Sequence, residues 1–257
     1  MLFVSTMLYT LAKKLGLPGA AGELQRQVQE AVAVLGADGL KSGAAGARAV
    51  VGIPAAFTIA SLATLDEMQL HVNAGATVIG KGRSLAAAEF RESDADVWVS
   101  VDDDMAVARD TLEAMIAACR AEPCIVAAPY LLRGQDRVDM REQRVAIEKR
   151  TPNGARLHTI EAAGFGCVAM SKEIVERAYE WAGPERDFEH DGKTARALFQ
   201  DEVRGGQWVT EDYAFFSHVP PIYPRYAVRV GSTTHAGATL DLATLQRVDV
   251  QRRALVV

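Results

Sequence analysis

Residues 96–105 read DVWVSVDDDM, an apolar, β-branched run that leads directly into three aspartates. The apolar part predicts a buried strand. Adjacent carboxylates repel one another, so a cationic group is expected beside them. Mg²⁺ or Mn²⁺ is the natural candidate, because these ions prefer oxygen ligands and are often shared with substrate phosphates. In an extended segment Asp102 and Asp104 would point the same way and Asp103 the opposite way. The alternative is that the aspartates begin the next helix, where anions are favourable.

Outward from this stretch, strand patterns alternate with helix patterns. Such alternation predicts an α/β fold with a mostly parallel central sheet. Ligands bind such sheets beyond the carboxyl ends of the strands, which directs attention to Pro54-Ala55, the aspartate run and Pro129-Tyr130. The expected strands cover 49–55, 68–74, 96–101 and 124–130, and the expected helices cover 81–92 and 109–122.

Residues 1–46 are expected to form a helical N-terminal appendage with a Gly- and Ala-rich linker. Helical spacing of apolar residues predicts helices over about 3–15 and 22–35. Their apolar faces would pack on the domain or on a partner subunit, which makes a homo-oligomer an expectation. A helix lying on a membrane surface is the alternative. The main domain is expected over 47–240, followed by a tail over 241–257.

Composition excludes several classes of protein. The 257 residues are 49% apolar with a net charge of −5, which is ordinary for a globular protein and excludes collagen and wholesale disorder. An acidic chain is a poor general coat for nucleic acid. Three cysteines do not indicate a disulfide framework, so a reducing, cytoplasmic location is expected. No apolar run is long enough for a membrane-spanning helix.

Two further motifs carry candidate chemistry. GQWVTEDYAFF places Glu211 and Asp212 ahead of an aromatic run, where either carboxylate could serve as a general base; Thr210 as a simple helix cap is the alternative. In the Gly-rich stretch VGSTTHAG, His235 is either a surface histidine or a nitrogen ligand to the same metal. Gly164-Phe165-Gly166 forms either a tight turn before a buried strand or a loop whose backbone approaches a substrate.

Taken in order, these segments resemble a GT-A fold glycosyltransferase of the small, family-two-like phage or bacterial type. The resemblance implies a Rossmann-like nucleotide-sugar fold over about 48–240. The segments that carry it are VVGIPA, ATVIGKGRSLAAAEF, SDADVWVSVDDDM, IVAAPYLLR, AAGFGCVAMSKEIVE, TEDYAFF and VGSTTHAG.

The resemblance implies a role for each residue on the donor side. Asp102 would contact the nucleotide ribose or the metal, and Asp104 would bind a Mn²⁺ or Mg²⁺ ion that bridges the donor diphosphate. His235 would complete the metal site. Arg83 would contact the nucleotide or the diphosphate, and Pro54 with Ala55 would line the base pocket. The donor would be a nucleotide sugar, with a UDP-sugar as the first expectation.

On the acceptor side, the resemblance makes Asp212, or else Glu211, the base that deprotonates the acceptor hydroxyl. Gly164, Phe165 and Gly166 would shape the acceptor pocket. The reaction would invert the anomeric centre. A hydroxymethylated DNA base is one candidate acceptor; sugars, lipids and proteins are others.

Two other functions stay open from the sequence. A nucleotidyltransferase shares the α/β layer and the metal-binding carboxylates, although the Gly-rich, basic loop usual after its first strand is absent from IPAAFTIASL. A non-catalytic binding module could retain the same fold. The carboxylates and the histidine favour the enzyme.

Overall fold

The computed structural model describes residues 2–7, 68–73, 79–102, 104–132, 135–235 and 238–243. The side chains of the first two segments are outside this description. Several expectations also lie outside it, namely the strand over 49–55 with Pro54 and Ala55, and the helix over 22–35.

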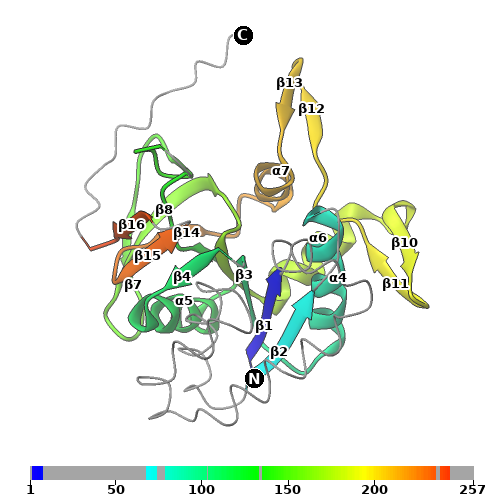
Figure 1. Ribbon diagram of the computed structural model, residues 1–257, viewed down its shortest axis with the longest axis horizontal. Coiled ribbons are helices and arrows are strands. Elements are labelled where there is room, and N and C mark those ends of the chain that lie inside the picture. Colours follow the sequence, from blue (N-terminus) through cyan, green and yellow to red (C-terminus); the bar gives the residue numbers. More distant parts are fainter. Residues whose placement is uncertain are drawn as a thin grey trace.

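A nine-stranded sheet forms the centre of the protein (Figure 1), in the order β2-β1-β3-β9-β5-β14-β8-β6, with β7 pairing on β8. Its strands are β1 (Leu2–Met7), β2 (Met68–Asn73), β3 (Val97–Asp102), β5 (Ile125–Ala127), β6 (Met140–Glu142), β7 (Glu148–Arg150), β8 (Arg156–Ala163), β9 (Cys167–Ser171) and β14 (Arg225–Val228).

The prediction of a mostly parallel, GT-A-like sheet is wrong. Among the described strands, β1 is parallel to β2 and β3, and β5 is parallel to β14. The pairs β3/β9, β5/β9, β14/β8, β6/β8 and β7/β8 are antiparallel. Parallel neighbours need a long crossover, usually a helix. The described part of the chain between β5 and its neighbour β9 contains no helix, so β9 joins β5 in the reverse direction.

The N-terminal expectation also needs correction. Residues 2–7 form strand β1, which lies between β2 and β3 and pairs in register with both, so the predicted helix over 3–15 is wrong for these residues. A short apolar run cannot be assigned to helix or strand by periodicity alone. The six residues therefore belong to the main sheet and not to a helical appendage. The domain boundaries otherwise remain predictions.

Helices cover both faces of the sheet: α4 (Ile79–Glu92), α5 (Arg109–Ala121), α6 (Lys172–Ala182) and α7 (Glu211–His218). Helix α5 lies on one face, whereas α4 and α6 lie on the other (Figure 1). Strand β3 alternates between them, because Val97, Val99 and Val101 join the core on the α5 side and Trp98 joins the core with α4 and α6. No described helix is long and apolar enough to span a membrane.

The remaining described strands form three smaller sheets. Strands β4 (Met105–Val107), β15 (Ser232–His235) and β16 (Ala238–Asp241) form one, in which His235 pairs with Met105. Strands β10 (Asp187–His190) and β11 (Lys193–Arg196) form a hairpin that follows a 3-10 turn at Pro184–Arg186. Strands β12 (Glu202–Arg204) and β13 (Gln207–Val209) form a second hairpin, which projects beside α7 (Figure 1). Its turn residues Gly205 and Gly206 have φ of 55° and 78°, which glycine adopts readily.

Candidate functional site

The candidate site lies at the carboxyl end of β3, where the loop 164–166 and the start of α7 also arrive. Asp102 is the last residue of β3, and its amide donates to the Gly166 carbonyl at 2.9 Å. The chain then turns at Asp104 before β4. Because of this turn, the side chains of Asp102 and Asp104 do not follow the alternation expected in an extended strand. They contact different partners.

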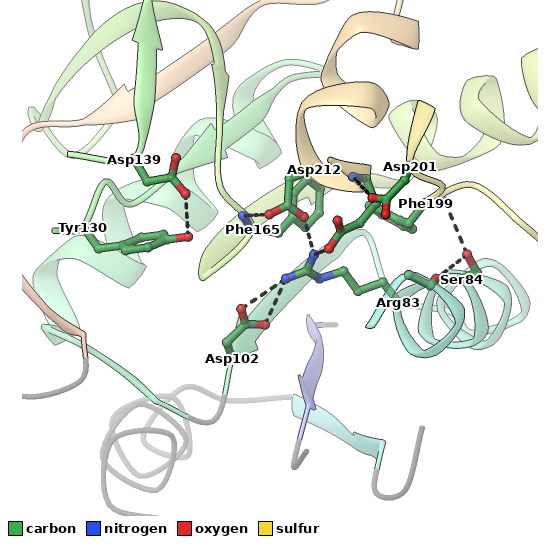
Figure 2. Close-up of polar contacts among 11 residues, drawn as sticks. Arg83, Ser84, Asp102, Tyr130, Asp139, Phe165, Phe199, Asp201 and Asp212 are labelled. Atoms are coloured by element: carbon green, nitrogen blue, oxygen red, sulfur yellow. Dashed lines mark hydrogen bonds and ion pairs between the residues drawn. The ribbon is translucent and has the colours of Figure 1, made fainter. Parts of the chain in front are cut away.

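Arg83 of α4 joins the carboxylates of this site (Figure 2). Its Nη2 donates to Oδ1 and Oδ2 of Asp102 at 3.2 and 3.1 Å. Its Nη1 donates to Glu211 Oε1 at 3.0 Å and to Asp212 Oδ1. The residue is only 2% exposed. The Nη groups of Arg83 thus contact carboxylates, and its expected contact with a nucleotide or diphosphate stays a prediction.

Glu211 and Asp212 begin helix α7. Thr210 is at the N-cap position but makes no side-chain capping bond. The Glu211 amide instead donates to Asp201 Oδ1 at 2.9 Å, and Asp212 Oδ2 accepts the Phe165 amide proton at 3.1 Å (Figure 2). Asp212 is thus held from two sides, by α4 and by the loop 164–166. Helix capping alone does not account for this arrangement.

One guanidinium faces three carboxylates, and this imbalance is visible in their proton affinities. Burial, assisted by repulsion from Asp212 and Asp104, raises the pKa of Asp102 to about 6 against the opposing effect of Arg83. Burial and repulsion from Asp212 raise the pKa of Glu211 to about 7. Burial also raises the pKa of Asp212, although Arg83 and the Phe165 amide oppose the rise. Burial lowers the pKa of Arg83, but the three carboxylates outweigh it and the net direction is upward.

Asp104 and His235 form a separate pair. His235 Nε2 lies 3.1 Å from Asp104 Oδ2, and its Nδ1 lies 2.7 Å from the carbonyl oxygen of Leu131. A carbonyl only accepts, so Nδ1 carries a proton and donates. A protonated ring donates from Nε2 to Asp104 Oδ2, whereas a neutral ring has its lone pair on Nε2; in the neutral form Nε2 and Oδ2, 3.1 Å apart, could bind one cation as adjacent ligands. Metal-binding histidines typically donate their other N–H to a carbonyl in this way.

Asp104 and His235 could supply two ligands to a Mn²⁺ or Mg²⁺ ion, whose remaining ligands would have to come from a substrate. The predicted set of three metal ligands is not brought together, because Asp102 pairs with Arg83. Within the described ranges, no three His, Cys, Asp or Glu side chains form a cluster that could hold a metal ion.

The loop Gly164-Phe165-Gly166 serves packing as well as the site. The Phe165 ring is fully buried, with the rings of Phe199, Phe215 and Phe216 at centroid distances of 5.0, 5.4 and 5.7 Å. Its side chain therefore does not line a substrate pocket, contrary to the expectation, and its contribution to the site is the backbone amide.

Sequence reasoning pointed to Tyr130 only as the end of a strand, and it missed Asp139 and Tyr213. The Tyr130 hydroxyl donates to Asp139 Oδ2 at 3.0 Å and the Tyr213 hydroxyl donates to Asp139 Oδ1 at 2.7 Å. Tyr130 also lies against His235, with ring centroids 4.8 Å apart. Tyr130 ends an expected strand and Tyr213 follows the Glu-Asp motif, which were usable signals. Asp139 lies in a segment of mixed charge, and no pattern in the sequence distinguishes it there.

No protein-family model matches the chain, and no curated protein matches it. Among solved structures, the crystal structure of A197 from STIV is similar, with 16% sequence identity and a TM-score of 0.46. The match covers 69% of this chain and 77% of that chain. A likeness of this degree carries no argument about activity.

Proposed function

We propose that the chain is a metal-dependent glycosyltransferase, which moves a sugar from a nucleotide sugar to an acceptor hydroxyl. The supporting observation is that a histidine–carboxylate pair and a buried carboxylate both lie near the end of β3. The pair Asp104 and His235 suits a divalent ion. The carboxylate of Asp212, held by Arg83 and the Phe165 amide, suits a general base.

Asp104 and His235 would hold the ion, and the bound ion would supply charge stabilisation for a departing diphosphate. Asp102, at the end of β3, would lie beside the donor ribose. Asp212 would accept the proton of the acceptor hydroxyl: each of its oxygens accepts one hydrogen bond from the protein, and a carboxylate oxygen can accept a second. Glu211 is the second candidate base. Direct displacement with such a base inverts the anomeric centre.

A raised pKa suits a base in this position. A base works best when its pKa lies near the working pH, because it then takes up a proton strongly and is still ionised. The pKa of Asp212 is raised by burial, with a contribution from repulsion by Asp139 and Asp201. The two hydrogen bonds from Arg83 and Phe165 favour the ionised form and oppose this rise.

A hydroxymethylated DNA base is one candidate acceptor. The segment 135–150 borders α7, where the Arg141 guanidinium lies 4.5 Å from the centroid of the Tyr213 ring, but it carries five basic and four acidic residues and so is not a basic surface. Duplex DNA with hydroxymethylated bases should then bind with an affinity that falls as salt rises. Binding that does not change with salt would contradict this acceptor.

The donor site is tested by thermal unfolding with UDP-, GDP-, CDP- and TDP-sugars, each with and without Mn²⁺. A ligand at 100 times its Kd stabilises the native state by about 2.7 kcal/mol. In a chain of this size this corresponds to about 5–10 °C in Tm. One nucleotide sugar should raise Tm only with Mn²⁺.

Asp104→Asn should abolish that rise, whereas Asp136→Asn, at an exposed position, should retain it. A flat response of the wild-type chain would refute the donor site. If a sugar nucleotide is bound, release of nucleoside diphosphate supports glycosyl transfer, and release of pyrophosphate from a nucleoside triphosphate would support the nucleotidyltransferase instead.

A further inference from the structure

Asp139 occupies an unusual position between the two halves of the candidate site. Each of its carboxylate oxygens accepts a tyrosine hydroxyl, from Tyr130 at 3.0 Å and from Tyr213 at 2.7 Å. Tyr130 follows β5 and lies against His235, whereas Tyr213 is on α7, directly after Asp212. Asp139 therefore connects the histidine of the metal pair to the helix that carries the base (Figure 2 shows the Tyr130 half of this contact).

Backbone hydrogen bonds and close packing hold Asp139 in this place. The Asp139 amide donates to the Tyr130 carbonyl at 2.9 Å, and the Gly164 amide donates to the Asp139 carbonyl at 3.3 Å. A Cβ on Gly164 would collide with Asp139 Oδ2 and with the Tyr130 hydroxyl. A Cβ on Gly166 would lie 2.6 Å from Tyr130 Cε1. The loop 164–166 is thus pressed against the two side chains, and the same loop donates the Phe165 amide to Asp212.

We propose that Asp139 is a positioning residue, which sets the place of Asp212 relative to the metal pair by holding Tyr130 and Tyr213 together. The inference rests on the proposed function. Each oxygen of Asp139 accepts a tyrosine hydroxyl, and these two contacts link Asp139 to α7 and, through Tyr130, to the loop 164–166, which are the elements that hold the base. Its charge also acts on Asp212, because repulsion from Asp139 raises the pKa of that carboxyl.

The test compares Asp139→Asn with the wild-type chain. An amide keeps the size of the carboxylate but can accept only through one oxygen, so one tyrosine hydroxyl faces an NH₂ group. Tyr213→Phe removes one hydroxyl and leaves the charge. Asp136→Asn, on the same segment and exposed, is the matched control.

The first readout needs no substrate. Hydrogen exchange of the amides of 211–218 should become faster in Asp139→Asn and in Tyr213→Phe, while Asp136→Asn matches the wild type. Unchanged exchange in Asp139→Asn would overturn the proposal, because the helix would then be held without this carboxylate.

The second readout is turnover of the nucleotide sugar that stabilises the wild-type chain, with Mn²⁺ and with water as acceptor. Displacing a base by about 1 Å can cost about 100-fold in rate, so kcat of Asp139→Asn should fall by about 10- to 100-fold. KM for the nucleotide sugar should stay within about threefold, because uniform binding is not affected. A rise in KM with kcat unchanged would overturn the proposal.

The pH profile separates a positioning effect from general loosening of the structure. With the charge of Asp139 removed, Asp212 ionises at lower pH, so the acidic limb of the rate profile of Asp139→Asn should move to lower pH. Tyr213→Phe should lower the rate but leave the acidic limb at the same pH. If the acidic limb of the rate profile is the same in Asp139→Asn as in the wild type, the charge of Asp139 does not act on the base, and the proposal is contradicted. The groups that face Asp212 are Arg83, Asp102, Tyr130, Asp139, Asp201, Glu211 and Tyr213.

Failure of this inference is distinguishable from failure of the proposed function. If no nucleotide sugar is bound or turned over by the wild-type chain, the proposed function falls and this inference falls with it. If the wild-type chain is active and Asp139→Asn has the same kcat and the same pH profile, only the inference falls.

Discussion

Replacing Arg83 by methionine removes the one guanidinium shared by three carboxylates. The side chain of Arg83 is 3% exposed, and those of Asp102, Glu211 and Asp212 are 25%, 18% and 16% exposed. Removing one partner from a buried ion pair typically costs about 3–5 kcal/mol, because the remaining charges are left uncompensated. In a chain of this size that loss lowers Tm by about 6–20 °C.

The stability lost in Arg83→Met should be larger at high pH than at low pH. Without the guanidinium, the folded-state pKa of each carboxyl rises further above its unfolded value. An acid whose folded pKa is raised contributes a stability that is present at low pH and lost as pH rises through the folded pKa. Asp102 and Glu211 already have pKa values of about 6 and about 7. The variant should therefore be weakened least near pH 5 and most at pH 8.

The assay is urea unfolding at both pH values, followed by far-UV circular dichroism. Arg91→Met is the matched control: it lies on the same helix and pairs with Glu176 at 2.9 Å, but both side chains are exposed. An exposed pair contributes at most about 1 kcal/mol. A loss in Arg83→Met no larger than in Arg91→Met, or a loss equal at pH 5 and pH 8, would refute the reasoning.

Three more outcomes follow from the same geometry. Gly164→Ala should destabilise the chain by about 1–3 kcal/mol in urea unfolding, because the added methyl collides with side-chain oxygens already in place; a variant as stable as the parent would show that the loop has room to move. Phe165→Ala should cost about 3–5 kcal/mol, since its ring is fully buried, and equal midpoints would contradict that burial. Glu211→Gln should gain stability relative to the wild type as pH rises from 5 to 8. The reason is that burial raises the pKa of the wild-type carboxyl to about 7, so its ionisation in the folded state costs stability. The opposite trend would mean that Arg83 lowers the pKa of Glu211 by more than burial raises it.

Much of the local structure was predictable from the sequence. The apolar, β-branched stretch before the aspartates predicts strand β3, and the structure has it over Val97–Asp102. Helical spacing predicts α4 and α5, and the structure confirms them over Ile79–Glu92 and Arg109–Ala121. These elements depend on the period of apolar residues within about a dozen positions, which the sequence displays directly.

The candidate residues were also visible as chemistry. Asp102, Asp104 and His235 were chosen because carboxylates and imidazole are ligands of divalent ions, and Asp212 because its Glu-Asp motif resembles that of the glycosyltransferases. The sequence did not reveal how they are paired. Arg83 is 129 positions from Asp212, and His235 meets Asp104 only because β15 pairs with β4.

The sequence by itself thus determined strand β3 and helices α4 and α5 and displayed the candidate side chains, because the apolar period and the residue types are local. Only the tertiary structure decided the direction of β8 and β9, the place of residues 2–7 as strand β1 in the sheet, and the partners of Arg83 and Asp139. Strand pairing and ion pairing join residues far apart in the chain, and their free energy depends on burial and on what else competes for the same partner. That competition, one guanidinium against three carboxylates, exists only in the folded protein.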